Sequence, residues 1–243
     1  MKKQAILAHD IGTSAVKSSV IYSGGQLAAV SATKHETIAE KSGYSEQNPE
    51  DWWYGLCKNT QNILREHPEL KSSICAIGVS GHMLGCLPVD SKGRALAKGL
   101  IHSDVRALKQ YEKVESLIGK DIMYSLTGNI LEPRSSICKI LWFKENRREI
   151  YNKTCFFHQS KDYITSRLTG NPNTTDYSDT SHAQLININE KQYLYDVFND
   201  LGIDKKKFPD IKNSIEICGK VTNKSAKEMG FPVFLSHTMA VSL

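Results

Sequence analysis

A short run near the N-terminus, D-I-G-T-S at residues 10–14, combines residue types that bind phosphate and a divalent cation. Gly12 is predicted to turn the backbone with a positive φ, so that the amides of this run converge on an anion. The hydroxyls of Thr13 and Ser14 add donors, and Asp10 can hold Mg²⁺ directly or through water. The alternative is an ordinary turn closed by an Asx hydrogen bond.

The elements that must position this run are those of an α/β fold. Apolar runs predict strands over 4–9, 15–22, 26–33 and 74–80. Lys17 lies on the second strand, from which its ammonium can neutralise phosphate charge. Helices are predicted over 49–67, from a cap at Ser103 or Asp104 to Ile118, and over 136–146, 161–168 and 192–201, with strand character over 176–188. A strand followed by a helix and a strand is typical of α/β proteins.

Further stretches narrow the interpretation. They are 43–53 (GYSEQNPEDWW), 77–83 (IGVSGHM), 136–146 (SICKILWFKEN), 160–163 (SKDY) and 175–179 (TDYSD). Together with DIGTSAVK at 10–17, which resembles the phosphate-binding entry of the actin-like ATPase superfamily, they resemble in order the motifs of FGGY carbohydrate kinases, especially xylulokinase-like members. The resemblance covers about residues 5–233. It implies a ribonuclease-H-like α/β lobe, a mixed sheet flanked by helices, that forms only the N-terminal domain of such a kinase.

The resemblance also implies a sugar site after the strand at 74–80, because ligands bind beyond the carboxyl ends of strands in open α/β sheets. In xylulokinase-like members a Met-His pair meets the sugar there. Met83 matches the methionine, whereas Leu84 stands in place of the histidine. His82, two residues earlier, is the expected replacement for the lost polar contact.

A second stretch expected at the sugar is IHSDVR at 101–106, which resembles the family's W-x-D-x-R with Ile101 in place of Trp. Asp104 is expected to accept hydrogen bonds from sugar hydroxyls, and Arg106 to fix Asp104. The alternative is that Asp104 caps a helix and Arg106 is solvated. Lys139 is interpreted as a local structural or salt-bridge residue.

The catalytic aspartate of the resemblance is missing. Family members carry a general base in a G-G-x-D turn just after a G-x-P-V strand. Here Gly230-Phe231-Pro232-Val233 is followed by Ser236-His237-Thr238-Met239, with neither glycine nor aspartate. We therefore predict a lobe over 1–233, an atypical tail over 234–243 and no C-terminal ATP-binding lobe. Residues 231–235 are expected to expose an apolar surface for that lobe or for self-association.

The resemblance implies that the whole kinase phosphorylates a ketose or polyol with Mg·ATP. It also implies that the other lobe holds most of the adenosine. The chain alone is expected to be inactive. The alternative is a non-catalytic lobe that binds sugar or pairs with a separate partner. A metal-dependent nuclease on the same fold is a third interpretation, and it needs several carboxylates around Asp10.

The composition of the chain argues against other classes of protein. The 243 residues carry 31 Lys and Arg against 26 Asp and Glu, a net charge of +5. These charges are spread evenly, which argues against a nucleic-acid binder. There is no apolar run long enough to span a membrane and no signal-peptide core. Six cysteines without a C-x-x-C pair indicate mostly buried, reduced thiols in a cytoplasmic protein.

Overall fold

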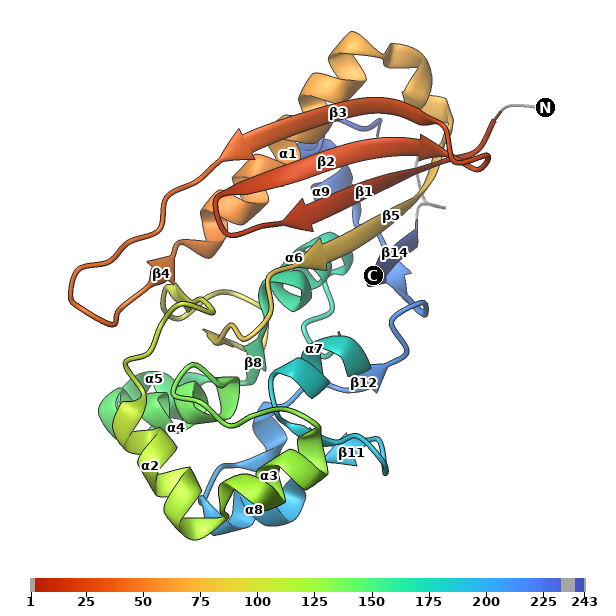
Figure 1. Ribbon diagram of the computed structural model, residues 1–243. Coiled ribbons are helices and arrows are strands. Elements are labelled where there is room, and N and C mark those ends of the chain that lie inside the picture. Colours follow the sequence, from red (N-terminus) through yellow and green to blue (C-terminus); the bar gives the residue numbers. More distant parts are fainter. Residues whose placement is uncertain (1–2, 233–238, 243) are drawn as a thin grey trace.

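A mixed sheet of six strands is the centre of the fold in the computed structural model, which describes residues 3–232 and 239–242 (Figure 1). Its order is β13-β14-β5-β1-β2-β3. The strands are β1 Ala5–Ile11, β2 Ala15–Tyr22, β3 Leu27–Lys34, β5 Ile74–Gly81, β13 Ile217–Lys220 and β14 Met239–Ser242. β5 runs parallel to β1 and to β14, and the other pairs are antiparallel. The carboxyl ends of β1 and β5 therefore meet at one edge.

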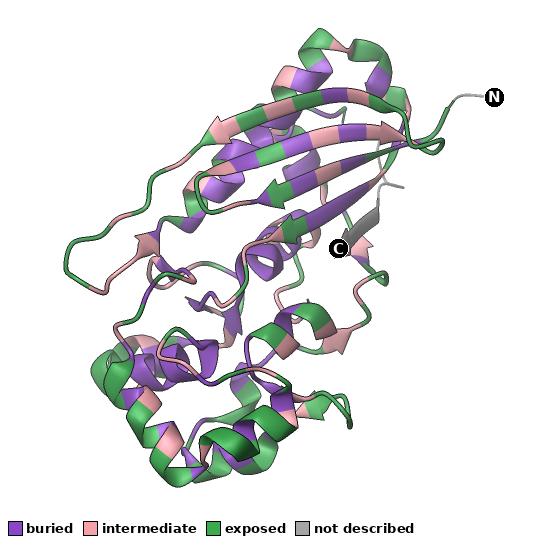
Figure 2. Cartoon of the chain, viewed as in Figure 1, coloured by how far each residue is buried: buried purple, intermediate pink, exposed green. Residues whose placement is uncertain are grey.

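Helices pack against one face of this sheet. Helix α1 (Pro49–Glu66) lies on β2 and β3, and α6 (Ser160–Thr169) lies on β5, β13 and β14. The short helix α9 (Asn223–Glu228) packs against α6. The apolar side chains of β1 alternate with period two, so that Leu7 and Ile11 enter this core while Ile6 and Asp10 point to the other face. In Figure 2 the strands of this sheet alternate between buried residues and more exposed ones, as expected where helices cover one face.

A second, mainly helical layer continues beyond the sheet and has its own apolar core, which includes Trp142, Phe157 and Phe198. Its helices are α2 Leu108–Leu117, α3 Lys120–Thr127, α4 Ser136–Asn146, α5 Arg148–Lys153, α7 Tyr177–His182 and α8 Tyr195–Asp200, with the 3-10 turn η2 Lys205–Lys207. The other 3-10 turn, η1 Pro68–Ser72, follows α1 and packs against α1 and β5. Two-stranded pairs join the layers: β4 Glu46–Gln47 with β7 Gly99–Leu100, β6 Leu87–Val89 with β8 Phe156–His158, β9 Thr175–Asp176 with β12 Ile211–Lys212, and β10 Ile186–Asn187 with β11 Gln192–Tyr193.

Several predicted elements are corrected by this fold. Helix α2 begins at Leu108 after Ala107, with no side-chain cap, so the predicted cap at Ser103 or Asp104 is wrong. The strand character predicted over 176–188 is found at Asp176 and in β10, whereas α7 between them was not predicted. Helix α8 begins three residues later than predicted, because residues 192–193 form β11.

The C-terminal segment differs from expectation in two ways. Phe231, predicted to be exposed, is buried in the core beside α9. The predicted strand at 232–235 falls mostly outside the described residues, and the strand observed is β14, which pairs with β5 and β13. Part of the predicted tail thus belongs to the central sheet.

The cysteines agree with their prediction, because within the described part of the chain none forms a disulfide and four are buried. The two that are not fully buried are Cys75 and Cys155. Among the described residues, none of the helices combines the length and the apolar character that a membrane span requires.

Candidate functional site

Two of the predicted loops lie side by side at the carboxyl edge of the sheet. Asp10 on β1 pairs in register with Ser80 on the parallel strand β5. Just beyond them the amide of His82 donates to the carbonyl of Ile11 over 2.9 Å. The run 12–14 and the run 82–84 therefore adjoin, as expected for loops that follow neighbouring parallel strands.

Asp10 and Lys17 face the open side of the sheet. They are register partners on β1 and β2, and Lys17 Nζ lies 3.9 Å from Asp10 Oδ2. Their side chains are 51% and 69% exposed, so this ion pair contributes little to stability and both groups can turn to a ligand. Beside them is a groove of about 550 Å³ that is lined by residues of β1, β2, β3 and β5.

The turn at Gly12 differs from its prediction. Gly12 does not adopt a positive φ. Its amide donates to Ala15 O over 3.1 Å, and a Cβ on Gly12 would lie 3.0 Å from that same oxygen. The glycine is thus required for close approach of the backbone, and its amide does not face an anion. Thr13 and Ser14 are exposed, so their hydroxyls are accessible to a ligand.

Gln47 anchors this turn from behind, a role that sequence reasoning missed. The buried Gln47 amide donates to Thr13 O over 2.7 Å and accepts from Trp52 Nε1 over 2.8 Å. His35 contacts Gly12 O through Nε2 at 3.1 Å. Gln47 belongs to the GYSEQ stretch at 43–47, which sequence analysis had singled out. No local pattern could place this stretch beside the turn, because its position depends on the pairing of β4 with β7.

His82 is half-buried between the two loops, with both of its ring nitrogens inside the protein. Its ring packs edge-on against Trp52, with centroids 5.3 Å apart. Burial lowers the pKa of His82 to about 3, and the neighbouring His102, His35 and Lys139 lower it further, so the ring is neutral at physiological pH. Neither ring nitrogen has a hydrogen-bond partner among the described residues. A neutral imidazole offers one donor and one acceptor, which suits a hydroxyl.

Met83 lies next to His82 and is 39% exposed, so its thioether is accessible from the cleft edge. Leu84 follows in the left-handed region at φ +58°. The backbone therefore leaves the extended conformation at Leu84.

Gly81 sets how closely this loop approaches α6. A Cβ at Gly81 would lie 2.4 Å from Ser160 Oγ and 3.2 Å from the amide of Lys161. Ser160 Oγ itself donates to His82 O over 3.1 Å. The glycine therefore allows the first turn of α6 to hold the carbonyl of His82.

Substituting Gly81→Ala is expected to lower the free energy of unfolding by about 1–3 kcal/mol, because the added methyl overpacks this contact. Chemical denaturation measures the change. Gly24→Ala is the matched control, since a Cβ there meets nothing within 4 Å, and it should leave stability nearly unchanged. Equal effects of the two substitutions would contradict the close-approach argument.

Asp104 and Arg106 form a buried network rather than a surface pair. Their side chains are 0% and 3% exposed. Asp104 Oδ2 accepts from the amide of Ser45 and from two nitrogens of Arg106, at 2.7 to 2.9 Å. Arg106 also pairs with Glu46 at 2.8 Å and lies 3.7 Å above the ring of Tyr44. Arg106 thus fixes Asp104 as predicted, while the alternative of a helix cap with a solvated arginine is wrong.

A second buried charge cluster lies under α6. Lys161 Nζ is 2.6 Å from Asp176 Oδ2 and 3.7 Å from Asp179 Oδ1. Asp162 Oδ1 and Asp179 Oδ2 are buried without hydrogen-bond partners among the described residues. Burial raises the pKa of Asp162 to about 7, and burial together with the nearby Asp162 raises that of Asp179. These residues tie α6 to α7 and do not reach the cleft.

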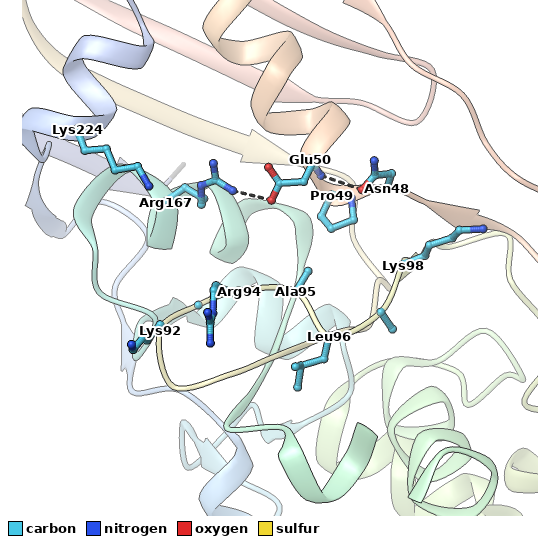
Figure 3. Close-up of a pocket in the computed structure, with 12 residues that line it drawn as sticks. Asn48, Pro49, Glu50, Lys92, Arg94, Ala95, Leu96, Lys98, Arg167 and Lys224 are labelled. Carbon is cyan, nitrogen blue, oxygen red and sulfur yellow. Dashed lines mark hydrogen bonds and ion pairs between the residues drawn. The ribbon is translucent and has the colours of Figure 1, made fainter. Parts of the chain in front are cut away.

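A separate cavity of about 600 Å³ lies between the N-terminus of α1, the loop 92–98, α6 and α9 (Figure 3). Its arginines are already paired: Arg167 with Glu50 at 2.6 Å, and Arg94 with Asp90 at 2.6 Å. None of the predicted site residues lines this cavity.

In the described part of the chain, Asp10 is not part of a carboxylate cluster of the kind that a metal-dependent nuclease would need. Within residues 3–232 and 239–242, no group of three or more His, Cys, Asp or Glu side chains is arranged to hold a metal ion. The nuclease interpretation therefore gains no support.

Comparison with known proteins identifies the family. The model of the FGGY family of carbohydrate kinases, N-terminal domain, matches residues 5–237. A xylulose kinase of Bacillus subtilis (strain 168) is 30% identical over 225 residues, covering 93% of this chain and 45% of that protein. A xylulose kinase of Staphylococcus epidermidis (strain RP62A) is 31% identical over 244 residues, covering 99% and 47%. The chain thus spans about half the length of the curated relatives it matches.

Solved structures show the same fold. Xylulose kinase from Rhodospirillum rubrum superposes with a TM-score of 0.91 at 19% identity, covering 98% of this chain and 48% of that one. Gluconate kinase from Lactobacillus acidophilus gives 0.89 at 21% identity, covering 98% and 47%. The predicted α/β lobe of the actin-like ATPase type is thereby confirmed. The order of motifs, the mixed sheet and the family match agree, and the chain belongs to the FGGY family of carbohydrate kinases, of which it carries the N-terminal domain.

Proposed function

We propose that the chain supplies the phosphate-binding and sugar-binding lobe of a Mg·ATP-dependent kinase that phosphorylates a hydroxyl of a ketose or polyol. The observation that carries this proposal is the hydrogen bond from the His82 amide to Ile11 O, which sets the run 82–84 beside the run 12–14. Phosphoryl transfer needs the acceptor hydroxyl and the phosphates in adjoining positions, because its catalysis is mostly positioning and charge stabilisation.

The phosphate half of the site has the donors this chemistry requires. Asp10 presents an exposed carboxylate, which fits Mg²⁺, an ion that is commonly bound by one or two carboxylates and keeps several waters. A Mg²⁺ ion held there would supply positive charge that offsets the charge of the phosphates. Lys17 adds a cation beside Asp10, and the exposed Thr13 and Ser14 add hydroxyls toward the phosphates.

The sugar half rests on His82 and Met83. His82 supplies unpartnered nitrogens on a neutral ring, and Met83 an accessible apolar contact. Asp104 is fully buried and its oxygens accept from protein donors, so we assign it, with Arg106, to positioning the run 43–47 rather than to contact with sugar. Through Gln47, that run supports the phosphate turn.

A non-catalytic lobe that binds sugar or pairs with a partner lobe is the second candidate. The sequence Ser-His-Thr-Met at 236–239 favours it, because it has no aspartate where the resemblance places the general base. Both candidates share the sugar site. They differ in whether any assembly containing this chain transfers phosphate.

Titration calorimetry with D-xylulose, and with glycerol and gluconate for comparison, tests the shared sugar site. The wild-type chain should show saturable binding to at least one of them. Met83→Lys should weaken it at least about tenfold by placing a solvated cation at the apolar contact. Ile122→Lys, which changes another exposed apolar side chain, on α3, should have no effect. No saturable binding by the wild-type chain would contradict the proposal.

A further inference from the structure

Lys139 on α4 is a fully buried cation with no ion pair in the described part of the chain. Its side chain is 0% exposed, and Nζ donates to Leu84 O over 2.6 Å and to Ile101 O over 2.7 Å. Of the two interpretations of Lys139, the salt bridge is therefore wrong, and a structural role agrees with these contacts. Lys139 instead joins the loop after β5, which carries His82 and Met83, to the loop after β7.

The loop that Lys139 holds is strained at the point of contact. Leu84 is one of three non-glycine residues with positive φ within residues 3–232 and 239–242, at +58°. An L-residue adopts this conformation only where surrounding contacts enforce it. The carbonyl that follows the strained φ is the one that accepts from Lys139. The Lys139 ammonium therefore binds the carbonyl oxygen of the residue whose backbone conformation is strained.

Neighbouring side chains complete the clamp one residue further on. Ser136, one turn before Lys139 on the same face of α4, donates to Gly85 O over 2.8 Å. Gln159 Oε1 accepts from the amide of Gly85 over 2.6 Å. The loop is therefore held on both sides of the peptide between Leu84 and Gly85.

Burial of this ammonium is costly, and among the described residues no ion pair offsets that cost. The nearest charged groups, Asp104 and Arg106, are already bonded to each other. Burial lowers the pKa of Lys139 to about 8, with Asp104, Cys86 and Cys138 opposing that effect. Even the neutral amine would keep two N–H donors, one for each of its two carbonyl partners. A buried cation retained at this cost calls for a role beyond packing.

We propose that Lys139 is a positioning residue for the sugar: by holding Leu84 in the left-handed conformation against the 101–106 loop, it fixes the direction of Met83 and His82. This inference rests on the proposed function in one respect, that residues 82–83 face the sugar. The holding of the loop itself is independent of any ligand.

The ligand-independent step is tested by amide hydrogen exchange in the full chain. Lys139→Met should speed exchange in peptides covering 82–86 and 101–106 at least about tenfold, because both loops lose a hydrogen bond to a charged donor. Peptides from β1 and β2 should be unchanged. Lys144→Met is the matched control: it lies on the same helix and donates to a different backbone carbonyl, Leu201 O, over 2.9 Å. Its exchange in both loops should equal that of the wild type.

The strain argument is tested by Leu84→Gly. Titrated with D-xylulose, Lys139→Met should lower affinity at least about tenfold in the wild-type background but less than about threefold in the L84G background, because glycine takes a positive φ at little cost. A merely structural lysine would lower affinity equally in both. Equal loss, or unchanged exchange in both loops of Lys139→Met, would overturn the proposal.

Two outcomes separate this inference from the proposed function. If the wild-type chain binds no sugar, the proposed function fails, while the exchange measurement still decides whether Lys139 holds the loops. If Lys139→Met does not fold, Ser136→Ala replaces it, since it removes the bond to Gly85 O and the 3.3 Å bond that Ser136 Oγ accepts from Gln159 Nε2, while both bonds of Lys139 remain. Faster exchange confined to the 82–86 loop in that variant supports the clamp, and unchanged exchange refutes it.

Discussion

Assayed alone, the 243-residue chain is expected to release no more ADP with D-xylulose than without it. Two contributions are missing from this polypeptide. A general base typically adds ~10²–10⁴-fold, and no aspartate follows the Gly230–Val233 stretch. Positioning of reactants supplies on the order of 7–11 kcal/mol, and the resemblance assigns the adenosine site to the other half of such kinases. Because positioning lowers the barrier more than a general base does, restoring an aspartate at Ser236 or His237 should not rescue turnover.

A coupled assay of ADP release over a panel of ketoses and polyols measures this expectation. Asp10→Ala is the control for contaminating kinases, because only activity that depends on Asp10 belongs to this chain. Co-expression with the C-terminal half of a xylulose kinase is the positive arm. Sugar-stimulated turnover by the chain alone that disappears in Asp10→Ala would show it to be a sufficient enzyme.

Asp162→Asn is expected to stabilise the chain at alkaline pH. The folded state raises the pKa of Asp162 from 3.8 to about 7, so it favours the protonated carboxyl. Stability from this group is therefore complete at acidic pH and is lost as pH rises through about 7. The difference in pKa corresponds to about 4 kcal/mol. An asparagine cannot ionise, and its NH₂ can donate to the unpartnered oxygen of Asp179.

Chemical denaturation between pH 5 and pH 8 tests this expectation. The wild-type free energy of unfolding should fall across this range, and Asp162→Asn should reduce the fall. Asp176→Asn is a control of opposite sign: burial opposes ionisation of Asp176, but Lys161 outweighs it and lowers its pKa, so losing the charge should destabilise the chain at pH 7. A wild-type stability independent of pH would refute the argument.

Elements with strong local signals could be predicted from the sequence. The strand 15–22 agrees at both ends, and α1 begins at Pro49, after the Asn48 cap, as the local residues indicate. Gly170 ends α6 in the left-handed conformation. Because loops after neighbouring parallel strands must adjoin, the juxtaposition of the runs 12–14 and 82–84 could also be predicted.

Features that depend on distant contacts could not be predicted. The predicted ligand Asp104 is turned inward by Arg106, which is itself held between Tyr44 and Trp142. Helix α7 is capped by Asp176, whose carboxylate is fixed by Lys161 on another helix. The role of Lys139 depends on its contacts with Leu84 and Ile101, which lie in two loops distant from Lys139 in the sequence. In each case a polar side chain is oriented by partners far along the chain.

The place of β14 in the sheet constrains how this chain is made. β5 pairs with β14, whose residues 239–242 are synthesised about 160 positions after it. Until they emerge from the ribosome, β5 is an edge strand with a row of unpaired backbone groups. Sheet completion is thus a late, high-contact-order event, and the nascent chain passes through a stage prone to aggregation.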